Sequence, residues 1–222
     1  MHSNVIKGSS LPADSDQVID LAQQLIRIPS FTYQESEVAR FLFDYLSKAD
    51  LDCELQEVPL PGGKISHQVT ARWKGSRPGK KALLCGHLDI LELYRPELWT
   101  VDPFEAAISD GWLYGQGSLN MKAGLAAQIG AVLALKSQHF DLTGEIVIAG
   151  VAAEIIGGLG ARHLLKQESD FDYAIVAEPT NLCVANISVG TGQGILRLWG
   201  DTLYFNPHPN PIYAMARFLQ EV

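Results

Sequence analysis

The chain has 222 residues, of which 47% are hydrophobic, and its formal net charge is −8 at pH 7. This length and apolar content can bury the core of one domain or somewhat more. The acidic balance leaves no basic stripe to neutralise phosphates, so we expect no nucleic-acid partner. Residues 1–16 lack the apolar core of a signal peptide, and the long apolar stretches are interrupted by Gly, Lys and Glu. We therefore expect a cytoplasmic protein that does not interact with a membrane.

The three cysteines, Cys53, Cys85 and Cys183, are far apart and form no Cys-x-x-Cys pair. An odd, scattered set predicts no disulfide framework and fits a reducing compartment. We expect each to be a small buried hydrophobic residue.

The first part of the chain predicts two helices followed by strands. Val18, Leu21 and Leu25 recur at helical spacing, and Pro29 ends that run. A second helical pattern follows, and then come runs rich in strand-forming residues. The helices are predicted at 15–28 and 35–47, and the strands at 53–58, 68–73 and 81–85.

The rest of the chain alternates between helical and strand patterns. The stretch 119–137 is rich in Ala and Leu and predicts a long buried helix. Further strands are predicted at 145–151, 173–177 and 195–199, and further helices at 159–167 and 212–219. This alternation favours an α/β fold with a sheet covered by helices on both faces. A change of composition near 183–194 predicts a domain at 1–184 and the beginning of another at 185–222.

Polar side chains follow three of the predicted strands. His87 and Asp89 come after the strand at 81–85, Glu154 after 145–151, and Glu178 after 173–177. Ligands of open α/β sheets bind outside the carboxyl ends of the strands, so these groups can converge. Asn120 opens the long helix after a glycine-rich turn and is expected to face the same crevice. Each residue alone is a weak signal, because a single histidine is more often a structural, hydrogen-bonded residue.

Ordered motifs run along most of the chain and resemble one family of zinc-dependent amidohydrolases and exopeptidases, peptidase M20-like. Its members include acetylornithine deacetylase, succinyl-diaminopimelate desuccinylase, aminoacylase and glutamate carboxypeptidases. The matching segments are 25–30, 86–89, Trp99 with 102–104, 110–117, 120–124, Glu154 with Gly157 and Gly158, and 177–180.

The resemblance implies a site with two zinc ions bridged by a carboxylate and a water molecule. By position, His87 and Glu178 resemble ligands of the first zinc, and Asn120 stands at the bridging position. Asp89 resembles the carboxylate that orients a ligand histidine. Glu154 resembles the general base that takes a proton from water and passes it to the leaving amine.

Three departures from the family pattern affect the second zinc. Asn120 replaces the bridging aspartate, and Ile155 replaces a glutamate ligand. The family's last ligand histidine is expected downstream of Val222, which implies a chain truncated at its C-terminus. We therefore expect one weakly bound zinc, for which cobalt could substitute, or no metal at all.

The resemblance also implies that residues 185–222 begin an incomplete α+β lid and dimerisation domain. Members of the family carry a histidine in this domain. The corresponding position of this sequence is Tyr204, and His208 lies four residues further along the chain. Truncation would leave a sheet edge uncovered, so we expect a homo-oligomer or a partner that covers that edge.

Three functions remain open at this point. The resemblance implies hydrolysis of the amide bond of a small-molecule N-acyl amino acid, as in acetylornithine deacetylase and hence arginine biosynthesis. A non-catalytic homologue, either a pseudoenzyme or a binding subunit, predicts no bound metal. A dipeptide exopeptidase predicts a preference for dipeptides over acylated amino acids. The residues do not distinguish an acetyl from a succinyl group.

Overall fold

The structure is a computed structural model that describes residues 15–187, 196–199 and 210–221. The chain divides into two units, 1–182 and 183–222. The first unit contains a five-stranded sheet, and the second contains one described helix.

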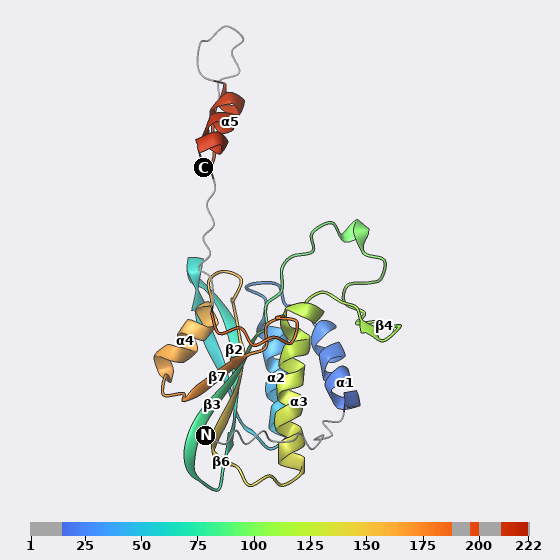
Figure 1. The fold of residues 1–222 in the computed structure, drawn as a ribbon, viewed down its shortest axis with the longest axis vertical. Coiled ribbons are helices and arrows are strands. Elements are labelled where there is room, and N and C mark those ends of the chain that lie inside the picture. The colour runs from blue at the N-terminus through green and yellow to red at the C-terminus, as the bar shows by residue number, and fades with distance from the viewer. Residues whose placement is uncertain (1–14, 188–195, 200–209, 222) are drawn as a thin grey trace, which may run out of the picture. The chain divides into compact units, whose positions relative to one another are not determined.

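The sheet of the first unit is mixed, with the order β1-β2-β6-β3-β7 (Figure 1). The strand β2 runs antiparallel to both β1 and β6, whereas β3 runs parallel to both β6 and β7. Their bounds are Asp52–Leu60 for β1, Lys64–Lys74 for β2, Arg77–His87 for β3, Thr143–Val151 for β6 and Tyr173–Val176 for β7. A separate two-stranded ribbon consists of β4 (Ile108–Ser109) and β5 (Trp112–Leu113).

Three helices cover one face of this sheet, and their bounds are Ser15–Ile26 for α1, Ser36–Lys48 for α2 and Ala123–Ser137 for α3. Figure 1 shows them together beside the strands. The helix α2 packs on β1 and β2, α3 packs on β3 and β6, and α1 packs on α3. Leu42, Leu125 and Ile129 from these helices meet Val69 and Ile148 from the sheet in the main core.

The opposite face of the sheet carries α4 (Leu159–Gln167), whose Leu164 is buried against Leu83 and Val147. Successive side chains of a strand point to opposite faces, so Val147 faces α4 while Ile148 faces α2 and α3. The prediction of an α/β sheet with helices on both faces is thus confirmed.

The start of the long helix differs from its prediction. The α-helix begins at Ala123, and residues Ser118–Lys122 form a π-helical turn. Within this turn Asn120 has φ −124° and ψ 98°, outside the helical region. Lys122 is buried and donates hydrogen bonds from Nζ to the carbonyls of Leu25 and Ile28, both at 2.8 Å. This anchor ties the turn to the end of α1, where unpaired helical carbonyls need donors.

The segment Ser118–Ser137 is long and apolar enough to cross a membrane, judged by length and composition alone. In the structure, Leu125, Ala126, Ile129 and Val132 of this segment are buried in the core between α1 and the sheet. These contacts explain its apolar character as that of a core helix.

The strand β7 ends the described sheet. It pairs with β3 only, and Tyr173, Ile175 and Val176 are each more than half exposed. Within the described residues, its other edge therefore has no strand partner. The homo-oligomer or partner that we expect to cover such an edge stays a prediction.

The second unit contains α5 (Pro211–Glu221), which begins with a typical cap. The side-chain oxygen of Asn210 accepts a hydrogen bond from the Ile212 amide at 2.8 Å, and Pro211 occupies the first helical position. The prediction of a strand at 195–199 is wrong for residues 196–199, which form neither strand nor helix. A strand needs a hydrogen-bonding neighbour, and the described residues of this unit offer none.

Two other predictions concern this unit. Cys183 is exposed, so the expectation that all three cysteines are buried is wrong there; Cys85 is buried and Cys53 is partly buried. Tyr204 and His208 lie outside the described residues.

Candidate metal centre

The carboxyl ends of the three parallel strands bring the predicted site residues together. His87 is the last residue of β3, Glu154 follows the end of β6 by three residues, and Glu178 follows the end of β7 by two. Because β6, β3 and β7 are adjacent and parallel, these ends lie at the same edge of the sheet.

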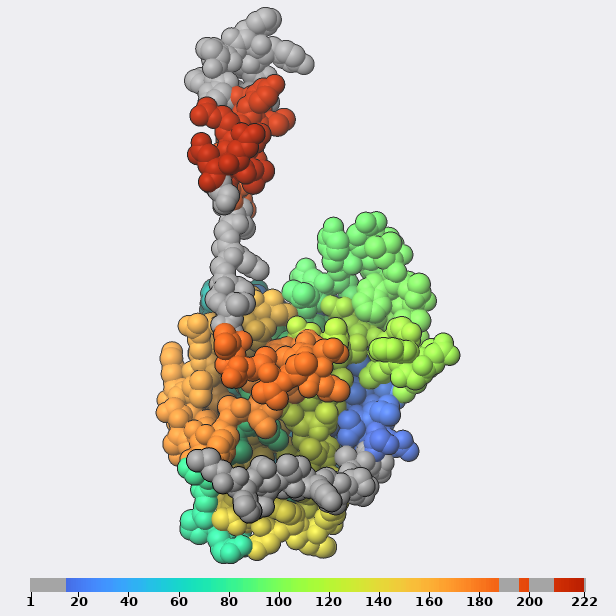
Figure 2. Space-filling model, viewed as in Figure 1, coloured from blue at the N-terminus to red at the C-terminus, as the bar shows by residue number. Residues whose placement is uncertain are grey.

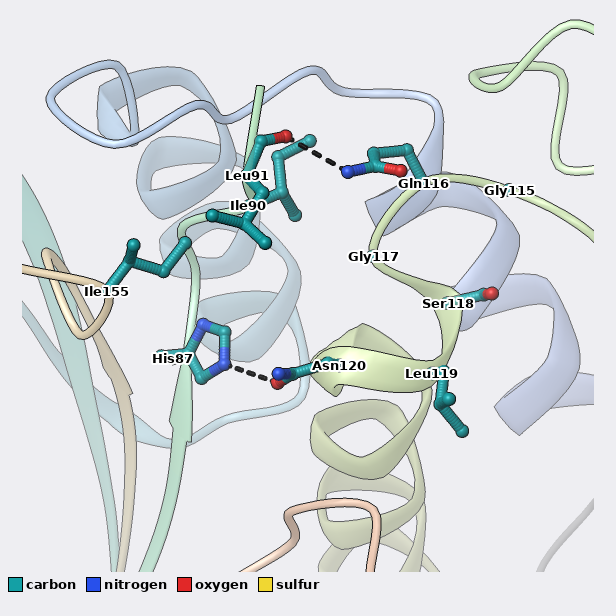
Figure 3. A pocket seen from close by; sticks show the side chains of 10 residues that line it. All are labelled: His87, Ile90, Leu91, Gly115, Gln116, Gly117, Ser118, Leu119, Asn120 and Ile155. Carbon is teal, nitrogen blue, oxygen red and sulfur yellow. Dashed lines mark hydrogen bonds between the residues drawn. The ribbon is translucent and has the colours of Figure 1, made fainter. Parts of the chain in front are cut away.

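His87 lies at the centre of this edge, and its side chain is 2% exposed. Its Nδ1 is 2.8 Å from the Asp89 carbonyl oxygen and 3.4 Å from the Asp89 carboxylate. Its Nε2 is 2.7 Å from Oδ1 of Asn120 and 3.6 Å from Oε1 of Glu178. Figure 3 shows the imidazole and the Asn120 side chain pointing toward each other. One nitrogen therefore faces Asp89, and the other faces Asn120 and Glu178.

Asp89 is fully buried and serves as an anchor for the loop after β6. Its carboxylate accepts hydrogen bonds from the backbone amides of Glu154 at 3.0 Å and Ile155 at 3.1 Å. The hydroxyl of Thr32 donates a third bond, at 3.1 Å. The same carboxylate thus holds the histidine and the segment that carries Glu154.

Two glycines turn the chain from Glu154 into α4. The Glu154 carbonyl accepts hydrogen bonds from the amides of Gly157 and Gly158, both at 2.9 Å. Gly157 has φ 106° and Gly158 has φ 67°, a region where side chains other than glycine are strained. Gly157 and Gly158 therefore shape the loop that carries Glu154. Glu154 itself is exposed.

Charges around the imidazole shift several pKa values. Burial alone would lower the pKa of His87, but its hydrogen bonds to the Asp89 and Asn120 oxygens and the charges of Asp89 and Glu178 raise it to about 9. Burial raises the pKa of Glu178, as do the charges of Glu154 and Asp89, while the positive charge of His87 opposes them. Burial would raise the pKa of Asp89, but the hydrogen bonds from His87 and the two backbone amides lower it. Two carboxylates, those of Asp89 and Glu178, thus act on the His87 imidazole, and the charge of Glu154 acts on Glu178.

A pocket of about 260 Å³ opens beside His87 and Asn120 (Figure 3). Its apolar walls include Ile90, Leu91 and Ile155. Ile155 stands where the family resemblance leads one to expect a glutamate ligand, and its side chain offers no donor atom. Figure 2 shows one face of the molecule in space-filling form, coloured along the chain.

The donor atoms can be compared with zinc geometry. Zinc bonds of about 2.0–2.1 Å in a tetrahedron separate neighbouring donors by about 3.3 Å. The 3.6 Å between His87 Nε2 and Glu178 Oε1 is close to that separation. The 2.7 Å between Nε2 and Asn120 Oδ1 is shorter, so the amide would have to move back by about 0.6 Å. The set fits part of one coordination sphere.

Within the described ranges, no group of three His, Cys, Asp or Glu side chains is placed to hold an ion. The imidazole and one carboxylate are the strong donors here, and Asn120 adds a neutral oxygen. These residues therefore do not supply ligands for two ions.

Two residues that support the candidate site were not identified from the sequence. Thr32, whose hydroxyl binds Asp89, lies just beyond the motif at 25–30, and a lone threonine in a loop carries no signal. Lys122 belongs to the motif at 120–124, but only the structure shows that it is buried and anchors the turn that holds Asn120.

A mixed α/β sheet that gathers an imidazole and carboxylates at its strand ends has the architecture of an α/β enzyme domain. The model of peptidase family M20/M25/M40 matches residues 83–218. The chain belongs to this family of amidohydrolases and peptidases, whose members are metal-dependent.

Curated relatives support the same family. A succinyl-diaminopimelate desuccinylase of Methylorubrum extorquens is 34% identical over 167 residues, which cover 72% of this chain and 43% of the relative. Succinyl-diaminopimelate desuccinylase 2 of a Ruegeria species is 30% identical over 216 residues, covering 91% of this chain and 53% of the relative. The chain thus spans about half the length of the curated relatives it matches.

Solved structures share the fold. Human carnosine dipeptidase 1 has a TM-score of 0.64 at 21% identity, covering 75% of this chain and 39% of that chain. The di-peptidase Dug1p from Saccharomyces cerevisiae has a TM-score of 0.65 at 21% identity, covering 75% and 40%. The Bacillus subtilis YXEP protein, described as a dinuclear metal binding peptidase, has a TM-score of 0.52 at 21% identity, covering 72% and 42%.

Proposed function

We propose that this protein takes part in metal-dependent hydrolysis of the amide bond of an N-acylated amino acid. The observation that carries the proposal is the approach of His87 Nε2 to Glu178 at 3.6 Å, beside the loop that presents Glu154. An imidazole, a carboxylate and a nearby second carboxylate are the minimum set for binding an ion and accepting a proton.

His87 and Glu178 are the proposed ligands of one divalent ion, with Asn120 as a weaker third donor. When bound, zinc supplies a Lewis acid and lowers the pKa of a coordinated water. Cobalt is expected to substitute. The surplus of carboxylates around one imidazole favours a cation at this place, because a positive ion relieves their mutual repulsion.

Glu154 is the proposed proton acceptor. Its backbone amide is bound to the buried Asp89, so the start of its side chain is fixed while its carboxylate reaches solvent and substrate. Asp89 orients His87 through Nδ1, which leaves Nε2 directed toward Glu178. Glu154 is then placed to take a proton from water and to deliver it to the leaving amine.

The relatives supply the substrate class. The succinyl-diaminopimelate desuccinylases act on an N-succinylated amino acid, which supports an acylated amino acid as substrate and a role in amino-acid metabolism. Both N-acetylornithine and N-succinyl-diaminopimelate are therefore test substrates. A cytoplasmic location stays a prediction.

The test measures the metal content of the purified chain together with hydrolysis of both substrates after addition of zinc or cobalt. We expect about one ion per chain. Glu154→Ala should lower the turnover rate by about 10²- to 10⁴-fold, because it removes the general base, and should leave the bound metal in place. Glu105→Ala serves as the control, because this residue is exposed and lies outside the three strand ends. Turnover that does not respond to Glu154→Ala contradicts the proposal.

Two alternatives lead to other outcomes of the same test. A dipeptide exopeptidase, supported by the fold shared with carnosine dipeptidase 1 and Dug1p, would hydrolyse dipeptides faster than acylated amino acids. A non-catalytic homologue, supported by Asn120 and Ile155 at expected ligand positions, would retain no metal and show no turnover.

A further inference from the structure

The N-terminus of α3 touches the chain just before Glu178. Gly124 is the second residue of α3, and a Cβ atom placed on it would lie 2.2 Å from the Ala177 carbonyl oxygen. The same atom would lie 3.0 Å from the Ala177 Cβ and 3.3 Å from its carbonyl carbon. The nearest atom is a backbone oxygen and the next is the Cβ of an alanine, so no side-chain rotation can relieve such a contact.

The backbone conformation does not require glycine here, since Gly124 lies in the regular helix and its φ is not in the left-handed region. Within a helix, glycine costs about 1 kcal/mol relative to alanine. The close approach to Ala177 is therefore the physical reason for glycine at this position.

The strand end that Gly124 touches is held on its other sides. Val176 pairs with Cys85 of β3, and Gln128, also in α3, donates a hydrogen bond from Nε2 to the Ile175 carbonyl at 3.0 Å. A side chain at position 124 would push on the peptide between these contacts and Glu178. An ordinary contact begins at 3.4 Å, so the Ala177 carbonyl, 2.2 Å away, would have to move by about 1 Å.

We propose that Gly124 is a positioning residue that sets the reach of Glu178 toward His87. This inference rests on the proposed function, because it assigns Glu178 a role as a metal ligand. Glu178 Oε1 is now 3.6 Å from His87 Nε2, and metal–ligand distances tolerate changes of only about 0.2 Å. A displacement of about 1 Å at the neighbouring peptide is therefore large for this site.

The experiment titrates the full chain with Co²⁺ and records its visible absorption, which reports ligand geometry independently of turnover. Gly124→Ala should weaken Co²⁺ binding at least about tenfold, as expected for loss of ligand orientation. Gly130→Ala is the matched control in α3, because its Cβ would meet the side chain of Val18, 2.3 Å away, rather than the strand end. We expect Gly130→Ala to leave the Co²⁺ affinity and spectrum unchanged.

A double-mutant cycle shows whether Gly124 acts through Glu178. In a Glu178→Gln background, Gly124→Ala should cause no further loss of affinity. If its effect is instead fully additive, or if Gly124→Ala binds Co²⁺ as tightly as the unchanged protein, the positioning role is overturned.

Ala177→Val enlarges the other residue of the Gly124–Ala177 contact. It is the variant to use if Gly124→Ala does not fold. It should lower the affinity in a way that also depends on Glu178, and an unchanged affinity overturns the proposal. If the unchanged chain binds no Co²⁺, the proposed metal site itself fails, and that outcome is separate from a failure of the Gly124 variants alone.

Discussion

The two ends of the sheet both gather charged residues but balance them differently. At the amino ends of β3 and β6, Arg72 pairs with Glu168 at 2.5 Å and with Glu145 at 3.4 Å. Lys81 pairs with Glu168 as well, and with Asp170 at 3.1 Å. At the carboxyl ends, Asp89 and Glu178 lie beside the single His87, and the charge of Glu154 acts on Glu178.

The pKa values follow this difference. At the amino ends, the Arg72 hydrogen bond lowers the pKa of Glu168 to about 2; burial opposes this shift, and Lys81 adds to it. At the carboxyl ends, burial and neighbouring carboxylates raise the pKa of Glu178. At the amino ends each of the three carboxylates is paired with Arg72 or Lys81. At the carboxyl ends three carboxylates accompany one imidazole, and a cation would relieve their mutual repulsion. The contrast separates a structural ion network from a binding site.

The largest expected effect on stability belongs to Asp89→Ala. This change removes the acceptor of two backbone amides and the Thr32 hydroxyl and leaves them without a partner in the core. We expect the free energy of unfolding to fall by about 3–5 kcal/mol, measured by urea denaturation. Asp170→Ala, at the opposite end and 78% exposed, should cost less than about 1 kcal/mol. Equal losses would contradict the view that Asp89 anchors the site.

A second prediction concerns stabilisation by zinc. Zinc at about 100 times its dissociation constant should raise the free energy of unfolding by about 2.7 kcal/mol, because it binds the folded state. Glu178→Gln should remove most of this gain. Glu168→Gln makes the same chemical change at the opposite end of the sheet and should retain it. Urea denaturation with and without zinc measures this gain for both variants. An equal gain in the two variants would contradict the proposed difference between the two ends of the sheet.

The smallest expected effect is a pH dependence at the amino ends. The pKa of Glu168 is about 2 in the folded state and 4.5 by its ordinary value, so its contribution to stability is present above pH 4.5. That contribution disappears as the pH falls through about 2. Glu168→Gln should cost about 1–2 kcal/mol at pH 7, since the pair is partly exposed. The difference between the two proteins should shrink between pH 4.5 and 2, and a constant difference would show that the charge of Glu168 contributes nothing.

Local patterns predicted most elements of the first unit. The periodicity of Leu21 and Leu25 placed α1, and the strand-forming runs placed β1, β2, β3, β6 and β7. The ribbon of β4 and β5 was not predicted, because two-residue strands leave no periodic signal. The strand at 195–199 was predicted from its apolar residues, but a strand exists only where a neighbour pairs with it.

The amino-acid sequence by itself determined the residue types available for chemistry: His87, Asp89, Glu154 and Glu178 after strands, and Asn120 and Ile155 where the family resemblance predicts carboxylates. It also determined the alternation of helices and strands, because side-chain periodicity is a local property.

Only the tertiary structure decided which nitrogen of His87 faces which partner, how Asp89 holds the loop of Glu154, and how closely Gly124 approaches Ala177. Those features depend on strand order, register and backbone packing between segments far apart in the chain. Distances between such segments follow from the close packing of the whole core, which no local pattern encodes.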